Sequence, residues 1–262
     1  MTDNTNLRTG GQIMVDQLRI HGADTIFCVP GESYLASLDA LYDAQDDIRL
    51  IVCRQEGGAA YMAEAYGKLT GRPGICFVTR GPGATNASLG IHTAHQDSTP
   101  LILLVGQVGR AMMDREAFQE VEFRQMYAPL SKWVSQIDDP ARIPEMMARA
   151  FHVATSGRPG PVVLALPEDM QKETAAADDA RRYVPTQPAP DPDAMARMRE
   201  LLAGAKRPMV IVGGSGWTPE AVADFRAFAE GSNLPVAAAF RRQDLYDNRL
   251  PNYAGDFGLG VN

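Results

Sequence analysis

The sequence has 262 residues, of which 45% are hydrophobic and 22% are charged, and its formal net charge is −7. This composition is typical of globular proteins and excludes disordered, collagen-like and coiled-coil chains. Acidic and basic residues are mixed along the chain without a basic stripe, so we expect no nucleic-acid partner. No apolar run approaches the length of a membrane span and no secretory leader is visible, so we expect no membrane association and a cytoplasmic location.

The three cysteines, Cys28, Cys53 and Cys76, each lie in or beside an apolar run. An odd number at wide spacing argues against a disulfide framework or a zinc site, so we expect them to be reduced and buried in strands. The histidines show no metal-ligand spacing, and we expect no metal site formed by this chain.

Apolar, β-branched runs alternate with helical segments over most of the chain. A capping-box pattern at Thr9 and Gln12 precedes the first helix. We expect, in chain order, helix 13–20, strand 25–29, helix 34–44, strand 48–53, helix 59–70, strand 75–79, helix 84–95, strand 101–105, a further strand at 130–134, helix 140–155 and strand 162–166. This alternation predicts an α/β fold with a doubly wound parallel sheet over residues 1–170.

The composition changes after Pro167, where Pro, Asp and Ala predominate as far as Pro192. We expect an exposed linker there, which we place at 171–192. A second α/β unit follows at 193–262, with helix 194–202, strand 209–212, helix 219–230, strand 236–239 and an irregular Gly-rich end. Two strands cannot close a stable α/β domain, so we expect this unit to be incomplete or to lean on another element.

Three glycine-containing loops follow expected strands, at 30–32, 54–58 and 79–86. Ligands bind at the carboxyl ends of the strands in open α/β sheets, and glycine lets a ligand approach the backbone closely. Glu56 lies between an apolar strand and a helix, a placement that could desolvate a proton-transfer group. The alternative is an acid that the helix dipole favours at an N-terminus.

Two glycine motifs have ambiguous patterns. Gly81–Pro82–Gly83 before a helix could bind an anion or could only form a tight turn. The loop 213–216 resembles a dinucleotide fingerprint but lacks its final glycine. A nucleotide-binding oxidoreductase module in the second unit therefore stays an alternative.

Five motifs occur in a fixed order: Val-Pro-Gly-Glu at 29–32, Arg-Gln-Glu-Gly-Gly-Ala-Ala-Tyr at 54–61, Thr-Arg-Gly-Pro-Gly-Ala-Thr-Asn at 79–86, Ala-His-Gln-Asp-Ser-Thr-Pro-Leu at 94–101 and Ala-Phe-Gln-Glu at 117–120. Together they resemble the thiamine-diphosphate-dependent acetolactate synthase family, strongly over residues 1–167 and more loosely to the end. The resemblance implies a pyrimidine-binding domain at 1–170, followed after the linker by the N-terminal part of a central Rossmann-like domain.

The resemblance also implies roles for individual residues. Glu56 is implied to be the catalytic carboxylate that hydrogen-bonds the cofactor's ring nitrogen N1′ and favours its imino tautomer. The implied cofactor-binding residues are Pro30, Gly31, Glu56, Thr79, Pro82, Gly83 and Asn86. Gln119 is implied to be the second catalytic residue, facing the reacting carbon, and the implied substrate-pocket residues are His95, Gln96 and Phe118. For His95 the alternative is a cation that satisfies a helix C-terminus.

The implied activity is decarboxylation of a 2-keto acid and transfer of the resulting acyl carbanion, by a homodimer or homotetramer, with the cofactor as electron sink. The family binds the diphosphate through Mg²⁺ in a domain absent from this chain, because Gly255–Asp256–Phe257 lacks the third glycine of the Gly-Asp-Gly motif. We therefore expect this chain to be inactive alone. The alternative function is a non-catalytic or split-subunit thiamine-diphosphate-binding module that needs a separate diphosphate-binding chain.

Two departures from the family pattern are visible. Arg80 stands where acetolactate synthases usually carry Ser. The segment 239–244 does not resemble their flavin-contacting loop, which puts FAD, and acetolactate as the product, in doubt.

Overall fold

The computed structural model describes residues 7–260 and divides the chain into two compact units, Met1–Thr186 and Gln187–Asn262. A six-stranded parallel sheet in the order β3-β2-β4-β5-β7-β6 forms the centre of the first unit. Its strands are β2 (Thr25–Cys28), β3 (Arg49–Val52), β4 (Gly74–Val78), β5 (Leu101–Gln107), β6 (Trp133–Gln136) and β7 (Pro161–Pro167). The predicted parallel sheet is confirmed, including the strand near 130–134.

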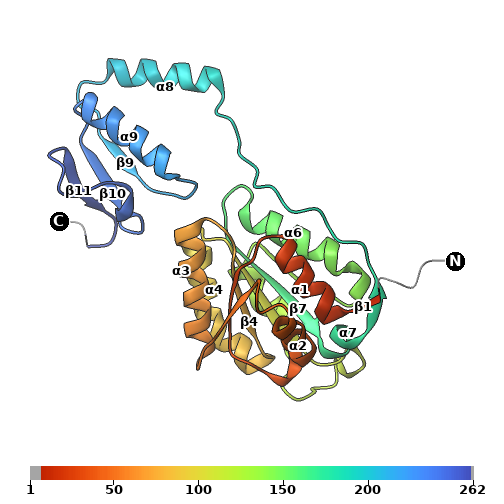
Figure 1. Cartoon of the computed structure of the whole chain (residues 1–262). Coiled ribbons are helices and arrows are strands. Elements are labelled where there is room, and N and C mark those ends of the chain that lie inside the picture. Colours follow the sequence, from red (N-terminus) through yellow and green to blue (C-terminus); the bar gives the residue numbers. More distant parts are fainter. Residues whose placement is uncertain (1–6, 261–262) are drawn as a thin grey trace. The chain divides into compact units, whose positions relative to one another are not determined.

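Helices cover both faces of this sheet (Figure 1). One face is covered by α1 (Gly10–Ile20), α2 (Leu35–Asp43) and α6 (Ile143–Thr155), and the other by α3 (Glu56–Thr70), α4 (Gly81–Asp97) and the short α5 (Phe123–Tyr127). The side chains of β5 show why, because Ile102 and Leu104 enter the first hydrophobic core while Leu101 and Leu103 enter the second. An apolar strand with alternating side chains buries both of its faces only between two helical layers.

Two predicted local features have clear outcomes. Thr9 caps α1, with its hydroxyl accepting the Gln12 N–H while the Gln12 side chain accepts the Thr9 N–H, so the capping box is confirmed. All three cysteines are free, as expected, but only Cys28 and Cys76 are buried in strands. Cys53 lies just after β3 and is partly exposed.

The expected exposed linker begins later than the composition indicated. After β7 the chain forms α7 (Glu168–Lys172) and then β8 (Thr174–Ala176), which pairs antiparallel with β1 (Leu7–Thr9). The chain stays on the first unit as far as Tyr183, whose N–H donates to His21 Nδ1. Composition was misleading here because tertiary contacts, rather than local propensity, hold this segment.

The second unit contains α8 (Pro192–Gly204), β9 (Val210–Val212), α9 (Pro219–Gly231), β10 (Val236–Ala239) and β11 (Tyr253–Phe257). Its three parallel strands are ordered β11-β10-β9. The expectation of only two strands is wrong, because β11 forms where we expected irregular chain. Its sequence, Tyr-Ala-Gly-Asp-Phe, has weak β-propensity and depends on pairing with β10.

The helices of the described part of the chain include none that is both long and apolar enough to cross a membrane.

Candidate active site

The carboxyl ends of β2, β3 and β4 lie level with one another at one edge of the sheet. Cys28, the last residue of β2, is paired with Val52 of β3 and with Phe77 of β4. The three glycine-containing loops therefore leave the sheet side by side, as the sequence predicted.

Glu56 is the first residue of α3, which begins three residues earlier than predicted. The side chain of Gln55 caps the helix by accepting the Gly58 N–H at 2.8 Å. Asn86 of α4 donates from Nδ2 to Glu56 Oε2 at 2.9 Å, whereas Oε1 accepts no hydrogen bond from the residues that the structure describes. Glu56 is partly exposed rather than fully buried, so the carboxylate presents one unoccupied oxygen at this edge.

Two glycines, Gly31 and Gly83, lie at the edge that carries Glu56. A Cβ added at Gly83 would lie 3.0 Å from Thr79 Cγ2 and 3.5 Å from Glu56 Oε1, so these three residues are neighbours. A Cβ added at Gly31 would lie 2.5 Å from Thr79 Cβ, which leaves no room for a side chain. The loop after β2 and the start of α4 thus meet at Thr79, and glycine at both positions lets these segments pack closely beside Glu56.

Buried aromatic and hydroxyl groups fix the loop that carries Pro30. Tyr34 stacks on Phe77 with a centroid separation of 4.0 Å, and its hydroxyl donates to the Val29 carbonyl. Burial raises the pKa of Tyr34, so this hydroxyl stays a donor. The hydroxyls of Ser33 and Thr79 are hydrogen-bonded at 2.9 Å. The loop is therefore positioned before any ligand is bound.

Gln119 also lies at this edge. Its carbonyl oxygen accepts the Gly81 N–H at 2.9 Å, which brings the loop after β5 onto the first turn of α4. Gln119 has a left-handed backbone with a φ of 65°. The neighbouring Phe118 is 74% exposed, so an apolar ring projects from the same loop.

Comparison with known families accounts for this arrangement. A model described as "Thiamine pyrophosphate enzyme, N-terminal TPP binding domain" matches residues 8–126, and one described as "Thiamine pyrophosphate enzyme, central domain" matches residues 195–262. The chain belongs to the thiamine pyrophosphate enzyme family. The match to the N-terminal model includes every residue of the edge described above.

The curated relatives of this thiamine pyrophosphate enzyme chain include acetolactate synthases. It is 36% identical to the acetolactate synthase large subunit of Parasynechococcus marenigrum over 96% of this chain and 42% of that protein. It is 34% identical to the isozyme 2 large subunit of Escherichia coli over 95% of this chain and 45% of that protein. It is 37% identical to the acetolactate synthase large subunit of Corynebacterium glutamicum over 87% of this chain and 37% of that protein. The chain thus spans less than half of the length of these relatives.

His95 and Gln96 do not lie at the edge that carries Glu56. Helix α4 starts at that edge and runs away from it, and the 12 residues from Gly83 to His95 span about 18 Å at the usual rise per residue. The carbonyls of His95 and Gln96 instead accept hydrogen bonds from Arg158. The structure thus places both residues at the end of α4 away from Glu56, where the motif at 94–101 leads into the start of β5. Their implied place in a substrate pocket with Phe118 stays a prediction.

The sequence did not identify the residues that hold the edge together. Arg80 is 7% exposed and forms ion pairs with Glu32 at 3.1 Å and with Glu168 of α7 at 2.7 Å. The buried Gln171 of α7 donates to the Ser33 carbonyl at 3.0 Å. An arginine beside an apolar strand indicates a buried charge that needs an ionic partner. The sequence around Arg80 does not reveal that this partner is Glu168, 88 residues away.

Of the two alternatives for Gly81–Pro82–Gly83, anion binding gains no support, because Gln119 already accepts the Gly81 N–H. No cluster of three or more His, Cys, Asp or Glu able to hold a metal ion occurs among the described residues. Asp256 lies in β11, exposed and paired in register with Ala238 of β10.

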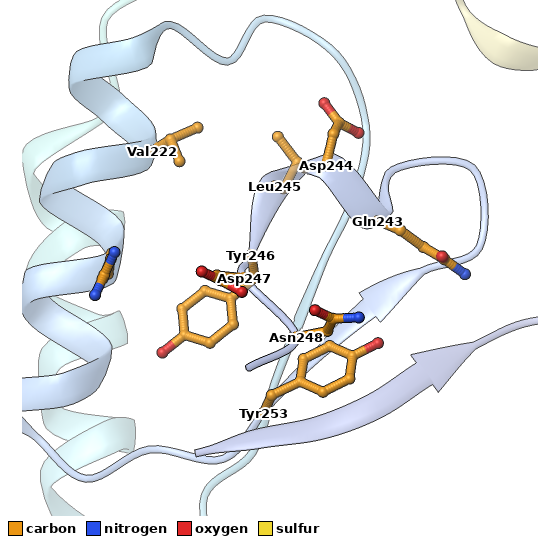
Figure 2. Close-up of a pocket in the computed structure, with 9 residues that line it drawn as sticks. Val222, Gln243, Asp244, Leu245, Tyr246, Asp247, Asn248 and Tyr253 are labelled. Atoms are coloured by element: carbon orange, nitrogen blue, oxygen red, sulfur yellow. The ribbon is translucent and has the colours of Figure 1, made fainter. Parts of the chain in front are cut away.

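In the second unit, the glycine-rich loop after β9 is tied to its own surroundings. Arg242 donates to the Gly214 carbonyl, and Trp217 Nε1 donates to the Gly213 carbonyl at 2.9 Å. A cavity of about 390 Å³ lies elsewhere in this unit, between α9 and the chain from 243 to 248. Figure 2 shows the rings of Tyr246 and Tyr253 beside this space. The cavity is not part of the edge that carries Glu56.

Proposed function

We propose that this chain forms the aminopyrimidine-binding part of a thiamine-diphosphate-dependent enzyme, acetolactate synthase-like, that decarboxylates a 2-keto acid and transfers the resulting acyl unit. The observation that carries the proposal is the carboxylate of Glu56. It is held on one oxygen by Asn86 and open on the other, beside the bare backbone of Gly83.

The residues at this edge fit the aminopyrimidine ring. Pro30, Gly31, Thr79, Pro82, Gly83 and Asn86 would surround it. Glu56 Oε1 would share a proton with ring nitrogen N1′, and Asn86 would hold the carboxylate at the required angle. When bound, thiamine diphosphate supplies a nucleophilic carbon and an electron sink for decarboxylation. Gln119 and Phe118, on the loop after β5, would face the reacting carbon.

The remaining parts of the proposal follow the family. Mg²⁺ and the diphosphate would be held by groups outside this chain, since the described residues form no metal cluster. They would belong to the diphosphate-binding part of a neighbouring subunit in a homodimer or homotetramer of the complete enzyme, and this chain alone would be inactive. Whether FAD binds the second unit is a separate question that the Glu56 edge does not address.

The test compares Glu56→Gln with the parent protein, loaded with thiamine diphosphate and Mg²⁺ in the complete enzyme that contains this chain. The amide keeps the shape of the side chain but cannot take up the proton. We expect turnover of 2-keto acids and exchange of the cofactor's C2 proton with D2O, followed by NMR, to fall by about 10²–10⁴-fold.

Glu64→Gln is the matched control for this test. Glu64 lies two turns along α3, where it accepts the Thr99 hydroxyl at 2.8 Å, away from the candidate site. We expect this variant to retain both turnover and C2 proton exchange. Unchanged C2 exchange in Glu56→Gln would defeat the proposal.

We keep a split arrangement as the second candidate, since the absence of a metal cluster from the described residues agrees with it as well as with the first candidate. In that case the chain binds the cofactor only with a separate diphosphate-binding chain. Titrating the purified chain with cofactor and Mg²⁺, alone and with a candidate partner chain, distinguishes the two arrangements.

A further inference from the structure

The loop between β5 and α5 has an unusual backbone. Three of its non-glycine residues, Asp114, Glu116 and Gln119, have φ values of 61°, 52° and 65°. Left-handed backbone is unfavourable for residues with a Cβ and persists only where the surroundings enforce it. Because Phe118 and Gln119 belong to this loop, whatever enforces its shape also sets their positions.

The carboxylate of Glu120 spans the loop from within. Its Oε1 accepts the Asp114 N–H at 2.7 Å, and its Oε2 accepts the Ala117 N–H at 2.9 Å. These backbone donors, the Ala117 N–H foremost, lower the pKa of Glu120, so the side chain is a charged acceptor at neutral pH. The Glu120 side chain, at the end of the loop, therefore binds the backbone at Asp114 and at Ala117.

The Glu120 N–H also donates to the Ala117 carbonyl at 3.0 Å, and the other described contacts hold the two ends of the loop. Arg110 is hydrogen-bonded to Asp169 through its backbone N–H and through Nε, at 3.1 and 2.9 Å. At the far end, Gln107 Nε2 donates to the Val121 carbonyl at 2.8 Å, and Gly81 donates to the Gln119 carbonyl. None of these end contacts reaches the Asp114 and Ala117 N–H groups, which donate to the Glu120 carboxylate.

We propose that Glu120 is a positioning residue that holds the 113–120 loop so that Phe118 and Gln119 face the edge carrying Glu56. This inference rests on the proposed function for its catalytic consequence, but its structural part can be tested without cofactor. Glu120 acts through the loop backbone and through Gln119, and its own carboxylate is already occupied by two N–H groups.

The structural test is hydrogen–deuterium exchange of the purified chain, read on peptides covering 113–120. We expect Glu120→Ala to speed deuterium uptake there by at least about tenfold, because two amides lose their acceptor. Glu122→Ala is the matched control, since Glu122 accepts the Arg124 N–H at 2.9 Å just beyond the loop. Uptake at 113–120 should be unchanged in this control. Equal uptake in the parent and Glu120→Ala would overturn the proposal.

Glu120→Gln provides a second variant if Glu120→Ala does not fold. Its single carbonyl oxygen replaces two carboxylate oxygens, so it can keep one of the two contacts strongly. We expect intermediate uptake at 113–120, and uptake equal to that of the parent would count against the proposal.

The functional test is a double-mutant cycle with Gln119→Ala in the complete holoenzyme. We expect Glu120→Ala to lower kcat by at least about tenfold with little change in KM, and to have less than a twofold effect when Gln119 is already Ala. Equal effects in both backgrounds would overturn the positioning role. Glu56→Gln is measured in parallel, because full activity in that variant defeats the proposed function, while the exchange data still decide the role of Glu120 in the loop.

Discussion

Acid should destabilise the first unit through His21. This side chain is 2% exposed and packs between Phe151 and Tyr183, with ring centroids 4.8 and 5.9 Å away. Its Nδ1 accepts the Tyr183 N–H at 3.2 Å, and its buried Nε2 has no partner among the described residues. Burial, and then the charge of Arg182, lower the pKa of His21 to about 4. A proton on Nδ1 would remove the acceptor that holds the segment ending at Tyr183.

The sign and size of the effect follow from linkage. A histidine with its usual pKa of 6.5 in the unfolded chain and about 4 in the folded one stabilises the fold fully only above pH 6.5. That stabilisation is lost as the pH falls from 6.5 towards 4. One pKa unit is worth about 1.4 kcal/mol, so the full loss is about 3 kcal/mol, of which about 2 kcal/mol falls between pH 7 and pH 5.

The assay compares the parent chain with His21→Asn, which keeps an oxygen acceptor for the Tyr183 N–H but cannot titrate. Urea unfolding of the first unit is followed by fluorescence of Trp133, in a Trp217→Phe background that removes the signal of the second unit. The free energy of unfolding of the parent should fall by about 2 kcal/mol more than that of His21→Asn between pH 7 and pH 5. Equal losses in the two proteins would refute the reasoning.

Two further predictions concern packing in the first unit and use the same unfolding assay. Gly74→Ala should destabilise it by about 3 kcal/mol or more, because the added Cβ would lie 1.8 Å from the Ala63 carbonyl oxygen. Gly58→Ala should have little effect, because its added Cβ would meet Gln55 Oε1 at an ordinary contact distance of 3.9 Å. Gln171→Leu should lower the free energy of unfolding by about 3 kcal/mol, because the buried carbonyls of Ser33 and Leu166 lose their donor. Lys172 is exposed, and Lys172→Ala should change the free energy of unfolding by less than about 0.5 kcal/mol.

The sequence predicted the sheet because its central strands are apolar over most of their length. β4 and β5 are fully buried on both faces, and such runs between helical segments have few alternatives. It also predicted which loops meet, since parallel strands end at the same edge. The contact between Glu56 and Asn86 follows from this topology, because α3 and α4 start from β3 and β4, the two strands that flank β2.

The sequence could not predict features that depend on distant partners. α7 is short and mostly polar, and it joins the unit through the buried Met170 and through polar contacts of Glu168 and Gln171 with residues far away in the sequence. β11 likewise depends on β10 for its strand character. The sequence did place His95 at the C-terminal end of its helix, whereas a substrate-pocket role for it came only from the resemblance of the motif at 94–101.

The short helix α7 connects three loops near the candidate site, namely those after β2, β4 and β5. Gln171 binds the loop after β2, and Glu168 binds Arg80 after β4. Asp169 binds Arg110 after β5, at the start of the loop that ends in Glu120. Each contact is polar and partly or fully buried. Each therefore requires a defined distance and direction between donor and acceptor, which apolar packing does not. The six strands alone therefore do not set the distance between Thr79 and Gln119, and a chain lacking α7 would keep the sheet while the loops after β2, β4 and β5 lost the helix that connects them.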